Sequence, residues 1–163
     1  MMKQKIHQKF VKYCGFKYIN VNNKVYVGSC PTTEEDINIL KQIGITSVLC
    51  LQRSDEDCSH YEYPKHWKYM NIPVYDCGYM SLYDNLNAVN FINNRSKCYV
   101  HCRNGKGRSR ACVYFYLRMC GHSDEYSLYR SGIKKNNQYI YAKKIFESYK
   151  NNQANLHKTF LSL

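Results

Sequence analysis

The chain has 163 residues, of which 44% are hydrophobic and 15% aromatic, enough apolar side chains for the core of one globular domain. Its formal net charge of +12 favours anionic substrates or partners. This composition excludes a disordered chain, and no apolar run reaches the about 20 residues that a transmembrane helix needs. The nine cysteines are odd in number and irregularly spaced, which argues against a disulfide framework. We therefore expect a cytoplasmic location, with the nucleus as the alternative.

The N-terminal third of the chain alternates strand and helix signals. The apolar run at 25–28 predicts a strand. Thr32 and Glu35 then have the spacing of a capping box, which predicts that a helix begins there. Gly44 ends that helix, and the apolar run at 46–51 is typical of a buried strand.

A further strand is predicted at 68–72, and it ends at Pro73. Asp76 then falls on a loop, where a carboxyl group can donate a proton and later accept one. We take Asp76 as the candidate general acid. Asp84 is the alternative, but the pattern after Ser81 predicts a helix, which places Asp84 off that loop.

The most informative segment is His101-Cys102-Arg103-Asn104-Gly105-Lys106-Gly107-Arg108-Ser109. Its flanks predict a buried strand before it and a helix after it. Glycines allow successive backbone N–H groups to turn toward an anion, and the helix adds unpaired N–H groups and its positive dipole end. That field favours a cysteine thiolate, and arginine can bind two phosphate oxygens at once. The pattern predicts a phosphate-binding loop with Cys102 as nucleophile.

The alternation of elements predicts a single α/β domain with a central, mostly parallel sheet flanked by helices. The expected strands lie near 25–28, 46–51, 68–72 and 98–101. The expected helices lie near 33–43, 81–94, 109–120, 124–134 and 139–151. We expect the domain to span 24–153, between an N-terminal extension at 1–23, helical within 1–17, and a C-terminal tail at 154–163. The phosphate-binding loop then leaves the carboxyl end of a strand, where open α/β sheets commonly bind ligands.

His101-Cys102, five residues and Arg108-Ser109 resemble the signature loop of the cysteine-dependent protein tyrosine phosphatase superfamily. The segment from Ile72-Pro73 to Asp76 is similar to the loop that carries the general acid in dual-specificity phosphatases. The series from Val-Gly-Ser at 27–29 to Val-Leu-Cys-Leu-Gln at 48–52 is similar to the opening of compact atypical dual-specificity phosphatases, including the laforin-like and plant glucan phosphatases. The resemblance covers roughly residues 24–135 and implies a dual-specificity phosphatase-like catalytic domain.

The resemblance implies a role for each residue of the site. Cys102 attacks phosphorus and forms a cysteinyl-phosphate, while Asp76 protonates the leaving oxygen. Ser109 hydrogen-bonds to the Cys102 thiolate, and His101 supports the loop. The expected substrate-binding residues are Arg103, Asn104, Gly105, Lys106, Gly107 and Arg108. This chemistry requires no metal or organic cofactor.

The expected substrates are phosphotyrosine and phosphoserine or phosphothreonine in proteins. Arg103, Asn104 and Lys106 depart from the loop of the glucan enzymes, which argues against glycogen or starch. Basic residues at the positions of Arg103 and Lys106 resemble those of the phosphatase and tensin homolog family, which implies phosphoinositides or inositol polyphosphates as an alternative. Both side chains could equally point into solvent. Further alternatives are a phosphate-binding scaffold and an RNA 5′-triphosphatase-like enzyme, since Tyr and Lys are interleaved through 129–150.

Cys58, His60 and His66 cluster without the spacing of a zinc site, so we expect no structural metal. Tyr63 and Tyr79 are, with Tyr61, candidates for the rim of the substrate site.

Overall fold

The computed structural model describes residues 15–161, with side chains up to residue 155. Five strands form one sheet in the order β1-β2-β5-β3-β4. They are β1 (Tyr18–Asn20), β2 (Val25–Gly28), β3 (Ser47–Cys50), β4 (Lys68–Asn71) and β5 (Cys98–His101). β1 runs antiparallel to β2, and the other neighbouring strands are parallel. The α/β class with a mostly parallel sheet is therefore confirmed.

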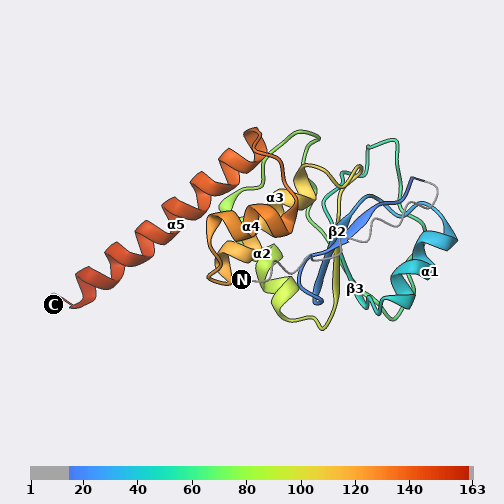
Figure 1. The fold of residues 1–163 in the computed structure, drawn as a ribbon, viewed down its shortest axis with the longest axis horizontal. Helices are drawn as coiled ribbons and strands as arrows, with labels where there is room; N and C mark the ends of the chain where they lie inside the picture. The colour runs from blue at the N-terminus through green and yellow to red at the C-terminus, as the bar shows by residue number, and fades with distance from the viewer. Residues whose placement is uncertain (1–14, 162–163) are drawn as a thin grey trace, which may run out of the picture.

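Helices cover both faces of the sheet. They are α1 (Glu34–Gln42), α2 (Leu82–Asn93), α3 (Arg108–Met119), α4 (Asp124–Ser131) and α5 (Asn137–Leu161). Figure 1 shows α1 on one side of the sheet and α2, α3 and α4 on the other. α5 begins against α3 and then runs beyond the rest of the domain (Figure 1). Each expected helix in this part of the chain is present.

The three central strands are buried on both faces, as parallel strands between helices require. Their register aligns the side chains in rows that alternate between the two faces. One row packs with α1, and it consists of Tyr26, Tyr99 and Val48. The next row packs in the core under α2 and α3, and it consists of Val27, Val100 and Leu49. The strand pattern thus builds two cores, one on each side of the sheet.

The last residues of the three central strands also form one row: Gly28, His101 and Cys50. Because the strands are parallel, the segments that follow them leave from the same edge of the sheet. The Cys30 N–H donates to the Arg103 carbonyl at 3.0 Å, so the segments after β2 and β5 are in direct contact. This edge is where the predicted site must assemble.

Two elements lie partly or wholly outside the range expected at 24–153. β1 lies within the segment assigned to an N-terminal extension, and Ile19 pairs with Val27 and is buried. The strand escaped prediction because it has only three residues and alternating burial. The helix predicted within 1–17 lies mainly outside the described residues. α5 continues to Leu161, through the predicted tail at 154–163.

The capping box of α1 lies one residue later than predicted. The Asp36 N–H donates to Thr33 Oγ1 at 3.2 Å, and the Asp36 carboxylate accepts from the N–H groups of Thr32 and Thr33 at 2.8 and 3.1 Å. Asp36 is buried by these bonds, whereas Glu35 is exposed to solvent. The pairing of Thr32 with Glu35 was therefore wrong, because two adjacent threonines and three successive acids offered equivalent spacings.

This shift gives a matched test of helix capping. Thr33→Ala removes the hydroxyl that accepts from Asp36 and should lower the free energy of unfolding by about 1 kcal/mol. Thr32→Ala removes an adjacent hydroxyl with no capping bond and should leave stability nearly unchanged. Urea unfolding of both variants measures the difference. A larger loss for Thr32→Ala would contradict the observed cap.

Candidate active site

The loop 102–107 connects β5 to α3 at the carboxyl edge of the sheet. Cys102 is buried, and its Sγ lies 3.3 Å from Ser109 Oγ in the first turn of α3. α3 begins after Gly107 with no side-chain cap and no acidic residue in its first turn, whereas side chains cap α1, α2 and α4. The backbone N–H groups that open α3 thus remain available to an anion beside the cysteine.

The loop is held by a close approach to the β2 backbone and by the side chain of Arg110. Gly105 has φ +64°, and a Cβ at this position would lie 2.3 Å from the Gly28 carbonyl carbon. Only glycine fits this close approach in a left-handed conformation. The Arg110 Nε donates to the Gly105 carbonyl at 2.6 Å, and Arg110 also donates to the Gly132 carbonyl. Arg110 therefore ties the loop to the segment between α4 and α5.

Arg108 is buried and is held by groups from two other loops. Its guanidinium makes a bidentate ion pair with Glu56, in which Nη2 donates to Oε2 at 2.9 Å. Nη1 also donates to the Val74 carbonyl at 2.8 Å, and Nη2 lies 3.3 Å from Asp76 Oδ1. A planar guanidinium fixed in this way presents one orientation to a bound phosphate.

Glu56 was not identified from the sequence. It lies in the loop after β3 between two other acids, Asp55 and Asp57, and no spacing distinguishes the three. Asp55 instead pairs with Arg53 and is exposed. The Arg108 hydrogen bonds hold the pKa of Glu56 below its ordinary value, against the opposing effect of burial.

His101, the last residue of β5, is buried and contacts the start of the loop at the Cys102 carbonyl. Burial lowers its pKa to about 3, so the ring is neutral near pH 7. Nδ1 lies 3.3 Å from the Cys102 carbonyl, which only accepts, and Nε2 lies 2.7 Å from the Tyr63 hydroxyl. The consistent tautomer carries its proton on Nδ1, so Tyr63 donates to Nε2. Tyr63 thus belongs under the loop and not at the substrate rim, where it was predicted.

Asp76 lies on the loop after β4, as predicted, with its side chain 67% exposed. Its Oδ1 accepts from the Cys77 N–H at 3.1 Å while facing Arg108. Asp84, the alternative acid, lies in the first turn of α2 and accepts from the Ser81 hydroxyl at 2.8 Å. Its place in a helix cap agrees with its exclusion from the loop.

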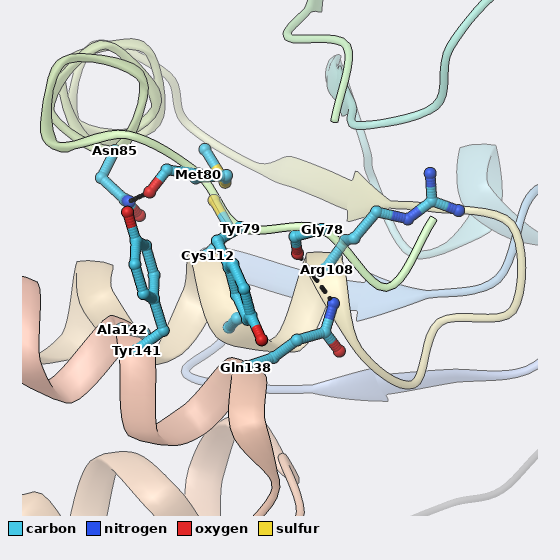
Figure 2. A pocket seen from close by; sticks show the side chains of 10 residues that line it. Gly78, Tyr79, Met80, Asn85, Arg108, Cys112, Gln138, Tyr141 and Ala142 are labelled. Atoms are coloured by element: carbon cyan, nitrogen blue, oxygen red, sulfur yellow. Dashed lines mark hydrogen bonds between the residues drawn. The ribbon is translucent and has the colours of Figure 1, made fainter. Parts of the chain in front are cut away.

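The loop that carries Asp76 is attached to the first turns of α5. Gln138 Nε2 donates to the Gly78 carbonyl at 3.1 Å, as Figure 2 shows. The rings of Tyr79 and Tyr141 stack with centroids 4.4 Å apart. Tyr79, a predicted rim residue, is thus a contact to α5. Gln138 also reaches the phosphate loop, since a Cβ on Gly107 would lie 2.1 Å from its Oε1. One side chain therefore contacts both loops.

These groups meet in a cleft with a volume of about 500 Å³. Of the predicted site residues, the cleft is lined by Cys102, Asp76, Asn104, Lys106, Gly107 and Arg108. His101 and Ser109 are buried behind it, and Gly105 packs against β2. Arg103 is exposed and does not line the cleft. The cleft is also lined by Lys17 and Lys134, neither of which the sequence predicted at the phosphatase site; Lys134 falls in the interleaved region 129–150.

Within residues 15–161, no group of three or more His, Cys, Asp or Glu side chains is arranged to hold a metal ion. Cys58 and His60, two members of the cluster with His66, line a separate pocket with Glu56. In the same part of the chain, no helix has the length and apolar character needed to cross a membrane.

A buried cysteine beside an uncapped helix, with a clamped arginine and a loop aspartate, defines a cysteine-dependent phosphatase. Residues 15–155 match the family model described as "Swiss Army Knife protein, DSP-PTPase phosphatase domain". The chain belongs to this dual-specificity phosphatase family, as its signature loop implied.

Two curated relatives are plant phosphoglucan phosphatases. The chloroplastic phosphoglucan phosphatase LSF1 of Arabidopsis thaliana is 29% identical over 121 residues, covering 63% of this chain and 20% of the relative. The amyloplastic phosphoglucan phosphatase DSP4 of Castanea sativa is 30% identical over 120 residues, covering 63% of this chain and 32% of the relative. The chain thus matches a third or less of the length of each.

A solved structure with the same fold is PTPMT1 in complex with PI(5)P. It has a TM-score of 0.69 and 17% sequence identity, and the match covers 83% of this chain and 98% of that structure.

The Glu56 ion pair predicts a pH dependence of stability. The folded-state pKa of Glu56 is lowered, so the unfolded chain binds more protons between the two pKa values. The stabilisation is present above the ordinary pKa of 4.5 and is lost as pH falls through the lowered value. Glu56→Gln should therefore destabilise the protein at pH 7, and the difference from wild type should shrink toward pH 3.

Urea unfolding from pH 3 to 7 measures this convergence. Asp55→Asn is the matched control, because Asp55 is exposed and adjacent in sequence. A constant difference between Glu56→Gln and wild type across this range would contradict the ion pair.

The attachment of the Asp76 loop predicts an effect that depends on the leaving group. Gln138→Ala should lower kcat about ten-fold for an alkyl phosphate, part of the ~10²–10⁴-fold that a positioned acid contributes. It should matter less for para-nitrophenyl phosphate, whose leaving group needs little protonation. The two substrates are compared in steady-state assays, with the exposed neighbour Asn137→Ala as control. Equal losses on both substrates would exclude a role through Asp76.

Proposed function

We propose that this domain hydrolyses phosphate monoesters in two steps through a cysteinyl-phosphate. The observation that carries the proposal is the convergence of Cys102, Arg108 and Asp76 in one cleft, with Ser109 Oγ 3.3 Å from the cysteine sulfur. The nucleophile, the phosphate-binding cation and the acid are thus contributed by two loops that meet at one point.

In the first step, Cys102 Sγ attacks phosphorus, and an S–P bond forms as the P–O bond to the leaving group breaks. The electron pair stays on the leaving oxygen, which takes a proton from Asp76. In the second step, the Asp76 carboxylate takes a proton from water, and the water oxygen attacks phosphorus. The S–P bond breaks, orthophosphate leaves and the thiolate is restored. The Ser109 hydroxyl stabilises that thiolate as it departs.

The first candidate substrates are proteins that carry phosphotyrosine and phosphoserine or phosphothreonine. Membership of a dual-specificity family supports this proposal. The 67% exposure of the Asp76 side chain also supports it, because an acid at an open rim can reach leaving oxygens at different depths.

The second candidate substrates are phosphoinositides or inositol polyphosphates. Lys106 lines the cleft, which supports this proposal, whereas Arg103 does not line it. The PTPMT1 structure of the same fold was solved with PI(5)P. The presence of a nucleophile, an arginine and an acid favours catalysis over a scaffold. For the RNA 5′-triphosphatase alternative, Tyr139 is buried and donates to Asp124, so it is not available for stacking on bases, whereas Tyr129 is exposed.

The mechanism is tested with three variants. Cys102→Ser should abolish turnover but keep phosphate binding, and Arg108→Ala should lose both. Asp76→Asn should slow release from poor leaving groups by about 10²–10⁴-fold. Free phosphate is measured with phosphotyrosine and phosphothreonine peptides, phosphoinositides and inositol polyphosphates. Normal turnover by Cys102→Ser would contradict the mechanism, and the ratio of peptide to inositide turnover decides between the two substrate classes.

A further inference from the structure

The cleft carries more positive charge than one phosphate group needs. Its lining includes five cationic side chains and a single carboxylate, Asp76. The cations are Lys17, Lys106, Arg108, Arg110 and Lys134. A cleft lined mostly by one sign of charge concentrates ions of the opposite sign.

Two of these cations are already engaged. Arg108 is paired with Glu56, and Arg110 donates to the carbonyls of Gly105 and Gly132. In contrast, the ammonium groups of Lys17, Lys106 and Lys134 make no ion pair or hydrogen bond with any side chain or carbonyl of the described residues. Three unneutralised cations thus remain around the cleft, besides the arginine that binds the reacting phosphate.

Hydrogen bonds fix the backbone of Lys17 and of Lys134 beside the cleft. The Lys17 N–H donates to Ser29 Oγ at 3.0 Å, and the Lys17 carbonyl accepts from the Ser29 N–H at 2.9 Å. The Lys134 carbonyl accepts from the Asn136 N–H at 2.8 Å, and Arg110 holds the neighbouring Gly132. Neither lysine is part of the phosphate loop, yet the backbone of each is tied to segments in contact with it.

The rest of the lining indicates the chemistry of the substrate. None of the described residues that line the cleft is aromatic, so an aryl group would find no flat apolar surface there. The neutral polar side chains are Asn104, Asn136 and Gln138, whose amides can both donate to and accept from hydroxyl groups.

We propose that Lys17 and Lys134, together with Lys106, form a second anion subsite that binds another phosphate group of the same substrate. The substrate class is a small polyol that carries two or more phosphates. One phosphate lies over Cys102, another lies between the lysines, and the amides contact the hydroxyls. This inference rests on the proposed function and specifies its substrate.

The test compares Lys17→Ala/Lys134→Ala with Lys144→Ala/Lys150→Ala. The control pair removes the same charge from exposed positions of α5 that do not line the cleft. The cleft variant should lower kcat/KM for inositol trisphosphate by about 10- to 100-fold, the effect of losing charge-assisted hydrogen bonds. Its kcat/KM for para-nitrophenyl phosphate should stay within about two-fold of the wild-type value. The difference between wild type and the cleft variant on inositol trisphosphate should become smaller as the salt concentration rises.

Binding to Cys102→Ser protein, measured by calorimetry, separates the subsite from turnover. The lysine substitutions should lower the affinity for inositol trisphosphate by a similar factor. The affinity for inorganic phosphate should stay nearly unchanged. Equal losses on both ligands, or equal losses in the control pair, would overturn the subsite. Failure of wild type to release phosphate from any monoester would overturn the proposed function, whereas the binding result would still decide the subsite.

Two sources share this chemistry. Soluble inositol trisphosphate and vesicles of phosphatidylcholine with phosphatidylinositol bisphosphate are compared with the same variants. If the cleft variant loses kcat/KM selectively on the soluble or on the vesicle substrate, the result supports the subsite and identifies which source the subsite binds. The proposal would be overturned if a singly phosphorylated peptide were turned over faster than inositol trisphosphate and the phosphatidylinositol bisphosphate vesicles, and if the lysine substitutions did not change the peptide turnover.

Discussion

A buried guanidinium must be neutralised, and this requirement organises the site. Arg108 has 2% of its side chain exposed and takes its partners from two loops that follow different strands. Glu56 comes from the loop after β3, while the Val74 carbonyl and Asp76 come from the loop after β4. Desolvating a charge without partners is strongly unfavourable, so these loops are constrained to converge on Arg108. The same convergence places Asp76 beside the loop that carries Cys102.

The cations of the cleft divide into two kinds. Arg108 and Arg110 are satisfied by the protein itself and hold loops in place. Lys17, Lys106 and Lys134 line the cleft without such partners in the described chain, which is the basis of the proposed second anion subsite. Two cations of the cleft therefore hold its loops in place, while three have no protein partner within the described residues.

Local sequence patterns were sufficient to predict a group of interacting residues where all of them lie in one continuous segment. The strand, loop and helix around Cys102 are contiguous, so the proximity of Cys102, Arg108 and Ser109 could be predicted from this one segment. Capping by Thr33 was misplaced by one residue because equivalent spacings overlapped. Tyr63 was misread because its partner, His101, lies 38 positions away and no periodicity connects them.

The sequence by itself determined the α/β class, the loop between β5 and α3 and the place of Asp76 on its own loop, because each depends on local spacing and hydrophobic periodicity. Only the tertiary structure selected Glu56 from three neighbouring acids and brought Lys17 and Lys134 to the cleft. The position of Glu56 depends on the parallel pairing of β3 and β5, which sends the segments after both strands to one edge of the sheet. Lys17 is brought there by the backbone pairing of its segment with Ser29, and Lys134 by the bond from Arg110 to the neighbouring Gly132. Long-range pairing of this kind leaves no signal in a single sequence, since exposed lysines and acids are common on any surface.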